Sequence, residues 1–199
     1  MAEEIENAAG GDAGKDEYKA PAPKSVEEIL KADQGDESLD QYKKKLLGNA
    51  ATGSKIVVDK SNPKNVIVRQ LTLLAEGRPE ITMDLSPETL KSMENKTLVL
   101  KEGCHYRLRI HFHVQREIVS GLKYVQKLSR HGVPVDKDEL MVGSYAPQAD
   151  MHAFTTPMEE APSGMLHRGT YKVKSLFTDD DKSEYLKWEW ILEIKKDWD

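Results

Sequence analysis

The sequence has very little cysteine and no long apolar segment, and both absences narrow its class. Cys104 is the single cysteine among 199 residues, so an intrachain disulfide framework is excluded. The longest apolar runs are only a few residues, too short to span a bilayer. The acidic start, MAEEIENAAGGDAGKDE, lacks the apolar core of a secretory signal. These features predict a cytoplasmic protein that does not insert stably into membranes.

Basic residues are fewer than acidic residues, and the acidic excess is unevenly distributed along the chain. The chain carries 29 Lys and Arg against 34 Asp and Glu, a formal net charge of -5. Residues 1–53 hold 12 acidic and 7 basic residues, so this excess of five acids accounts for the whole imbalance. A neutral body with an acidic arm disfavours nucleic-acid binding, which needs a basic face.

The N-terminal quarter divides into two parts. Residues 1–24 are rich in Ala, Gly, Pro and charged residues, which predicts a disordered acidic tail. The pattern of residues 25–53 predicts a short helical hairpin followed by a linker, and the apolar faces of its helices must be buried against another surface. That surface is either the chain's own body or a partner protein, and the polar, glycine-containing flanks favour a partner.

Residues 54–199 change to a period of two, which is typical of β-strands. Tyr106, Leu108, Ile110, Phe112 and Val114 alternate with basic residues, and turn residues separate several such runs. Residues 86–95 predict the only helical turn of this region. The pattern predicts an all-β fold, a sandwich or a barrel, behind a flexible arm.

No residue pattern supports catalysis or a cofactor. His111 and His113 share one strand face, as some metal ligands do, but Arg107 and Arg109 share that face and no third ligand follows at a fixed offset. The run Asp179-Asp180-Asp181 lacks the spacing of a calcium loop and predicts a hairpin tip. No nucleophile elbow, P-loop or dinucleotide fingerprint is present. We therefore predict neither an enzyme nor a bound metal.

The last strand is the most apolar one. Trp188, Trp190, Leu192 and Ile194 point to one face. Two indoles on one face suit either a filled core or the wall of an apolar cavity, and periodicity does not choose between them.

Several segments together resemble the Rho GDP-dissociation inhibitor family. In the body they are REIVSGLKY at 116–124, MVGSYAP at 141–147, EEAP at 159–162, FTDDDK at 177–182, WEW at 188–190 and IKKDW at 194–198. In the arm they are DESL at 36–39, YK at 42–43 and LLG at 46–48. The resemblance extends from about residue 18 to residue 199, in one order.

The resemblance implies an immunoglobulin-like prenyl-binding sandwich behind a regulatory arm. It implies binding of prenylated Rho-family GTPases in the GDP state as a 1:1 heterodimer, inhibition of GDP release, and membrane extraction by burial of the geranylgeranyl group. The pocket wall implied by the resemblance is Leu73, Leu98, Tyr106, Ile118, Tyr145, Leu166, Val173 and Trp190. Leu98 replaces an aromatic residue expected in familiar relatives, which predicts a wider pocket there.

The resemblance also implies two protein contacts. The arm is expected to hold the GTPase switch regions through Asp36, Ser38, Tyr42, Leu46 and Leu47. The basic tail that precedes the lipid is expected to face Glu159, Glu160 and Asp181.

Two alternatives remain open from sequence alone. The first is a general prenyl-cargo carrier of the phosphodiesterase delta type, which has a similar sandwich and no need of residues 25–48 as a GTPase-binding hairpin. The second is an enzyme on the β-body that uses His111 and His113 as metal ligands.

Overall fold

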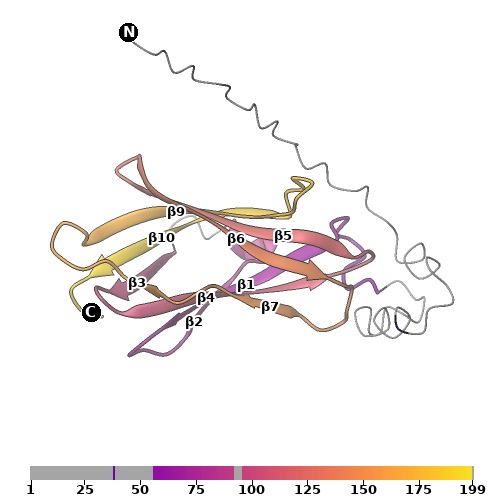
Figure 1. Cartoon of the computed structure of the whole chain (residues 1–199), viewed down its shortest axis with the longest axis horizontal. Helices are drawn as coiled ribbons and strands as arrows, with labels where there is room; N and C mark the ends of the chain where they lie inside the picture. The colour runs from indigo at the N-terminus through magenta and orange to yellow at the C-terminus, as the bar shows by residue number, and fades with distance from the viewer. Residues whose placement is uncertain (1–37, 39–55, 92–95, 199) are drawn as a thin grey trace, which may run out of the picture.

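A computed structural model describes Ser38 and residues 56–91 and 96–198. They form ten strands and one short helix (Figure 1). The strands are β1 (Val66–Ala75), β2 (Ile81–Asp84), β3 (Thr97–Lys101), β4 (His105–Val114), β5 (Val119–Arg130), β6 (Val133–Tyr145), β7 (His152–Thr155), β8 (Glu159–Glu160), β9 (Gly169–Thr178) and β10 (Leu186–Lys195), and the helix is α3 (Pro87–Leu90).

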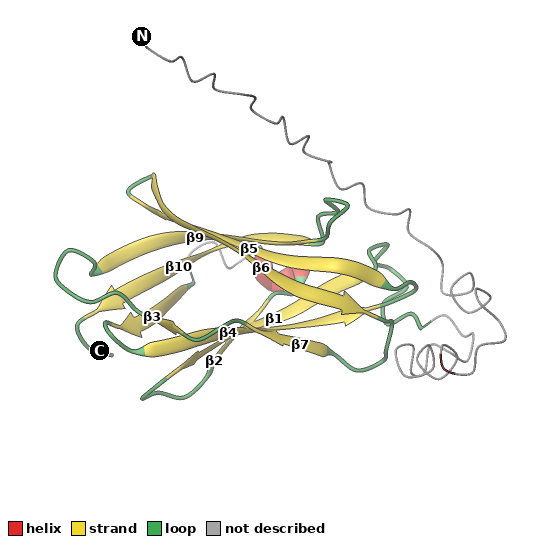
Figure 2. Cartoon of the chain, viewed as in Figure 1, coloured by secondary structure: helices red, strands yellow, loops and turns green. Residues whose placement is uncertain are grey.

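Two five-stranded sheets lie face to face, as Figure 2 shows. One sheet has the order β2-β1-β4-β7, with β8 pairing to β4. The other has the order β3-β10-β9-β5-β6, in which only the β3–β10 pair is parallel. The predicted all-β, immunoglobulin-like sandwich is confirmed.

The inward faces follow from the alternation in the sequence. In β4, Leu108, Ile110, Phe112 and Val114 are buried, while the residues between them are more exposed. In β10 the buried positions are Trp188, Trp190, Leu192 and Ile194. Successive side chains on a strand point to opposite faces, so each strand contributes one apolar row to the space between the sheets.

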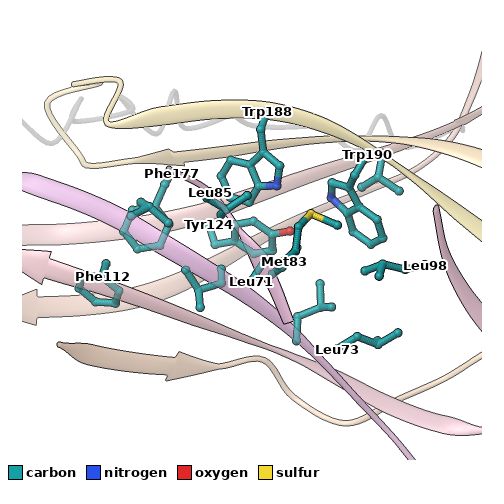
Figure 3. Packing of buried hydrophobic residues seen from close by; sticks show 14 of the residues in the cluster. Leu71, Leu73, Met83, Leu85, Leu98, Phe112, Tyr124, Phe177, Trp188 and Trp190 are labelled. Carbon is teal, nitrogen blue, oxygen red and sulfur yellow. The ribbon is translucent and has the colours of Figure 1, made fainter. Parts of the chain in front are cut away.

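Large side chains fill the middle of the sandwich (Figure 3). The Tyr124 ring stacks on Trp188 with centroids 6.0 Å apart, and Phe112 meets Phe177 at 5.1 Å. Ser175 links two of these aromatic residues, because its hydroxyl lies 2.9 Å from the Tyr124 hydroxyl and accepts a 3.0 Å hydrogen bond from Trp190 Nε1. This part of the interior is a filled core.

The sandwich has two distinct ends. At one, which we call the arm-side end, Arg116 N donates to Ile56 O, where the described body begins, and the 179–185 turn connects β9 to β10. At the other, the mouth end, β4 begins beside β8, and β9 begins beside the last residues of β10. The ends lie at the right and left of Figure 1. The ten residues of β4 separate them.

Two local predictions have different outcomes. The helical turn predicted within 86–95 is present as α3, which begins after Ser86 with Pro87 in its first turn. The apolar run Ile56-Val57-Val58 is one of the runs that the period-two region of residues 54–199 offers as a strand, and it is not a strand. Its backbone is instead held by the Gln115 side chain, whose Oε1 accepts hydrogen bonds from the amides of Val58 and Asp59.

Candidate functional site

A pocket of about 690 Å³ opens at the mouth end of the sandwich. Strands from both sheets contribute apolar side chains to its wall, namely Leu100, Tyr106, Leu128, Tyr171, Leu192 and Ile194. Leu192 and Ile194 continue the inward row of Trp188 and Trp190, so the pocket is an extension of the core space that side chains leave unfilled. Such a cavity suits an apolar guest.

Four carboxylates surround this apolar interior. Asp136 and Asp138 come from β6, and Glu159 and Glu160 come from β8. The Tyr106 hydroxyl donates a 2.6 Å hydrogen bond to Glu159 Oε2, which fixes that carboxylate above the pocket wall. Burial raises the pKa of Asp138, and the neighbouring negative charge of Asp136 raises it further. The mouth is therefore strongly negative.

Arg130 is the one guanidinium in the pocket lining, and its position is set by several contacts. Its Nη1 donates to the carbonyl oxygen of Leu166, and its Nη2 donates to that of Arg168 at 2.7 Å. The guanidinium also lies 5.4 Å from the centre of the Tyr171 ring. Arg130 thus ties the loop before β9 to the end of β5, along one side of the mouth.

A second ionic contact holds the same loop from the opposite direction. Glu102 accepts hydrogen bonds from Arg168 Nε at 2.8 Å and Nη2 at 2.6 Å, and from the Gly164 amide at 2.9 Å. The Arg168 hydrogen bonds, followed by the Gly164 amide, lower the pKa of Glu102 to about 2. The loop is anchored at both flanks without a disulfide.

The predicted wall residues fall into three groups. Tyr106 lines the pocket. Leu73, Leu98, Val173 and Trp190 are each at most 2% exposed and lie in the core that continues inward from it. That these four contact a guest stays a prediction, and so does a wider pocket at Leu98.

The other three predicted wall residues lie elsewhere. Ile118 precedes β5 and Tyr145 ends β6, both at the arm-side end, where Tyr145 packs edge-on against Phe112 at 5.1 Å. Leu166 lies in the loop before β9 and is 84% exposed. The structure does not bring these three side chains to the pocket.

The predicted tail-binding acids are separated in space. Glu159 and Glu160 lie at the mouth, whereas Asp181 is exposed in the turn at the arm-side end. Its two neighbours in that turn are engaged locally. Asp179 accepts hydrogen bonds from the Tyr185 hydroxyl and the Ser183 amide, and Asp180 pairs with Lys123 at 2.7 Å.

The predicted GTPase contacts fall mostly outside the described residues. This applies to Asp36, Tyr42, Leu46 and Leu47, and to the ranges 1–24 and 25–53 apart from Ser38. Ser38 is exposed and helical. The predicted roles of these residues stay predictions.

Sequence reasoning placed Leu192 and Ile194 on the apolar face of the last strand but did not assign them to the pocket. Leu100 lies two positions from Leu98 on the same strand face, so period-two alternation could have found it. Asp136 and Asp138 gave no such signal, because most residues of β6 before Leu140 are exposed and the segment shows no apolar alternation. Arg130 is recognised only from its tertiary contacts.

The other sequence candidates lie away from the pocket. His111 and His113 share the outer face of β4 with Arg107 and Arg109, as the alternation predicts. Within residues 56–91 and 96–198 and at Ser38, no group of three His, Cys, Asp or Glu side chains could hold a metal ion. Cys104 is half-buried, and this burial raises the pKa of its thiol, which makes the thiolate less available.

A family model described as "RHO protein GDP dissociation inhibitor" matches residues 3–197 of this chain. The chain belongs to the Rho GDP-dissociation inhibitor family. It is 51% identical to Rho GDP-dissociation inhibitor 1 of Homo sapiens over 182 residues, which is 91% of this chain and 86% of that protein. It is 46% identical to a probable rho GDP-dissociation inhibitor of Caenorhabditis elegans, over 94% of this chain and 96% of that protein.

A further Rho GDP-dissociation inhibitor and one solved structure of another protein also resemble this chain. Rho GDP-dissociation inhibitor 3 of Homo sapiens is 50% identical over 92% of this chain and 79% of its own length. A Niemann-Pick type C2 protein from Japanese carpenter ant gives a TM-score of 0.40 at 9% identity, over 70% of this chain and 99% of that one. In the part of this family member that the structure describes, no helix is long and apolar enough to cross a bilayer.

Proposed function

We propose that this chain binds prenylated Rho-family GTPases in their GDP state, blocks GDP release, and extracts them from membranes by burying the geranylgeranyl group. The observation that carries the proposal is an apolar pocket between the two sheets with four carboxylates in its lining. The pocket suits the lipid, and the carboxylates suit the basic residues that precede the lipid.

The energetics support a pocket of this kind. A geranylgeranyl group exposed to water costs roughly 0.8 kcal/mol per CH₂ equivalent, so more than ~10 kcal/mol for its twenty carbons. The carrier must offer a comparable apolar surface to compete with the bilayer. Leu73, Leu98, Val173 and Trp190 line the core beyond the pocket, and we propose that the sheets part there to admit the end of the chain.

The carboxylates supply the second part of the interaction. Glu159 is held by Tyr106, and Glu160 lines the same mouth, so a basic tail would meet fixed negative charge as its lipid enters. Asp181, at the arm-side end, would contact a different part of the same bound protein. Charge complementarity of this kind raises the association rate and fixes the register of the tail.

We assign GTPase-domain recognition to the arm. Leu46, Leu47 and Tyr42 would anchor residues 25–53 on the switch regions, with Asp36 and Ser38 as polar contacts. A switch region held in one conformation cannot open to release GDP. Linking this contact to lipid burial raises affinity through effective concentration. The product is a cytoplasmic 1:1 heterodimer, formed without a cofactor or a catalytic step.

The runner-up is a general prenyl-cargo carrier. It is favoured by one observation, that the residues lining the pocket in the described part of the chain lie in the sandwich, between Leu100 and Ile194. Such a carrier would bind a farnesylated peptide as tightly as a complete prenylated GTPase. The proposed inhibitor gains affinity from the GTPase domain through the arm and binds the complete protein more tightly.

Two full-length variants test the division of labour in parallel GDP-release and vesicle-extraction assays. Leu128→Trp fills the pocket and should abolish extraction, while Met141→Trp, on an exposed position of β6, is its control. A combined Leu46→Ser and Leu47→Ser variant should lose inhibition of GDP release and retain binding of the lipid alone. Unchanged GDP-release inhibition in that variant would contradict the role of the arm, and unchanged extraction by Leu128→Trp would contradict the role of the pocket.

A further inference from the structure

The pocket mouth carries an excess of negative charge that its own cation does not offset. Its lining contains four carboxylates, Asp136, Asp138, Glu159 and Glu160, and one guanidinium, Arg130. With His167 neutral, the formal charge of the lining is four negative minus one positive, or -3. A charged group brought to this mouth is therefore selected by its sign.

The nearby cations already have partners within the fold. Arg130 donates to two backbone carbonyl oxygens, those of Leu166 and Arg168. Arg168 makes two hydrogen bonds to Glu102. Lys137, beside Asp136 and Asp138 in β6, lies 3.8 Å from Glu139. An anion at the mouth would meet the single positive charge of Arg130 among the four lining carboxylates.

The carboxylates are held in place. Tyr106 fixes Glu159 by a 2.6 Å hydrogen bond, and β8 pairs with the start of β4, which places Glu159 opposite Tyr106 and Glu160 opposite His105. Asp136 and Asp138 are two apart on β6, so both point to the same side of the strand, where they line the mouth. They do not need to rearrange to act on a bound chain.

Lipid burial brings one more titratable group to this position. A prenyl group is attached to the sulfur of a cysteine, and in a processed prenylated chain that cysteine is the last residue. Its terminal carboxyl is therefore only a few bonds from the lipid and must lie at the mouth when the lipid is inside. A free carboxyl there is an anion, whereas a methyl-esterified carboxyl is neutral.

We propose that the acidic mouth selects prenylated chains whose terminal carboxyl is neutralised, as in a methyl ester, over chains that end in free prenylcysteine carboxylate, with Asp136 and Asp138 as specificity-determining residues. The inference rests on the proposed prenyl binding at this pocket and adds the state of the terminal carboxyl to it. The same field that attracts basic residues upstream of the lipid opposes an anion at its end.

Three soluble probes separate charge from size. They are N-acetyl-S-geranylgeranyl-cysteine, its methyl ester and its primary amide, titrated into the full-length protein by calorimetry. The amide is neutral like the ester but lacks the added methyl group, so it separates the effect of charge from that of added apolar surface. We expect the ester and the amide to bind about tenfold more tightly than the acid at low ionic strength, and the gap to shrink in high salt.

A paired variant assigns the effect to named residues. Asp136→Asn with Asp138→Asn should raise affinity for the acid severalfold and leave the ester unchanged. The control neutralises two exposed carboxylates away from the pocket, Glu88→Gln with Glu184→Gln, and should preserve the discrimination. Equal binding of all three probes would overturn the preference and leave prenyl binding intact. Failure of every probe to bind would overturn prenyl binding at this pocket, and the preference with it.

Discussion

The Tyr106 hydroxyl lies 2.6 Å from Glu159 Oε2 and donates a hydrogen bond to it. The bond joins the start of β4 to β8, and it links an apolar wall residue to an acidic rim residue. The Tyr185 hydroxyl makes a bond of the same length to Asp179 Oδ2 at the opposite end of the sandwich. Both pairs join a tyrosine hydroxyl to a carboxylate, and of the two only the Tyr106–Glu159 pair lies at the pocket.

These two tyrosines give a matched pair of variants. Tyr106→Phe and Tyr185→Phe should each lower the free energy of unfolding by about 1–2 kcal/mol, because each removes one hydrogen bond to a carboxylate. Only Tyr106→Phe should weaken binding of a prenylated basic peptide, since only Glu159 lies at the mouth. Urea denaturation and peptide titration measure the two quantities. Equal loss of peptide affinity in both variants would contradict the local role of the Tyr106–Glu159 bond.

The Glu102–Arg168 pair predicts a stability difference that depends on pH. Hydrogen bonds from Arg168 and Gly164 lower the pKa of Glu102 from its ordinary 4.5 to about 2. The resulting stabilisation is fully present above pH 4.5 and is lost as the pH falls toward 2. The difference in melting temperature between wild type and Glu102→Gln should therefore be constant near neutral pH and shrink below pH 4.5.

Arg168→Gln should show the same pH dependence, because the two variants break one ion pair. Thermal melts across pH 2–7 provide the measurement. A difference that stays constant down to pH 2 would show that the ionised form of Glu102 is not the stabilising one.

We expect the hydrogen bonds of Arg130 to restrain the loop before β9. Arg130→Lys keeps the charge but loses the fork that reaches the carbonyl oxygens of Leu166 and Arg168. Backbone amides of residues 163–168 should exchange with deuterium about fivefold faster, since one lost hydrogen bond of ~1 kcal/mol changes an opening equilibrium by that factor.

The control for the Arg130 variant is Arg116→Lys. Arg116 also donates to backbone carbonyl oxygens, those of Asp59, Asn62 and Lys64, but does so at the arm-side end. Its variant should leave exchange in residues 163–168 unchanged. Exchange that is equally fast in both variants would indicate a general loosening of the sandwich and would contradict a local tie by Arg130.

A side chain at Gly121 of β5 would collide with Asp180 in the turn after β9. The φ of Gly121 is +64°, and a Cβ there would lie 2.0 Å from Asp180 Oδ2, while Oδ1 of the same carboxylate pairs with Lys123. Gly103 has a similar φ of +69° but no atom within 4 Å of such a Cβ. Both alanine variants incur about 1–2 kcal/mol of left-handed strain. Only Gly121→Ala should lose further stability in chemical denaturation, and equal losses would contradict the collision with Asp180.

The strands that form the core were predictable because each buries one apolar face. In β10, the alternation from Trp188 to Ile194 predicted the buried row, and all four residues are at most 4% exposed. The alternation of β4 was equally informative. Such strands carry their orientation in the sequence, since a shift of one residue would expose the apolar row.

The mouth was not predictable by the same reasoning. Most of β6 before Leu140 is exposed, so its sequence carries no period, and the pairing of β5 with β6 shifts register between Leu128 and Ser129. Resemblance to the family identified Glu159 and Glu160 but did not identify Asp136 or Asp138. Sequence also cannot tell that Leu166 points outward, because a loop's direction depends on tertiary contacts such as those of Arg130.

The sandwich joins its N-terminal segment at one end and opens its pocket at the other. Ten residues of β4 at ~3.4 Å each place these ends about 30 Å apart. Under the proposed function, a GTPase bound by the arm beside Ile56 would have to span that length with the tether between its folded part and its lipid, which takes about nine fully extended residues. We therefore expect a GTPase with a shorter tether to contact either the arm or the pocket, but not both.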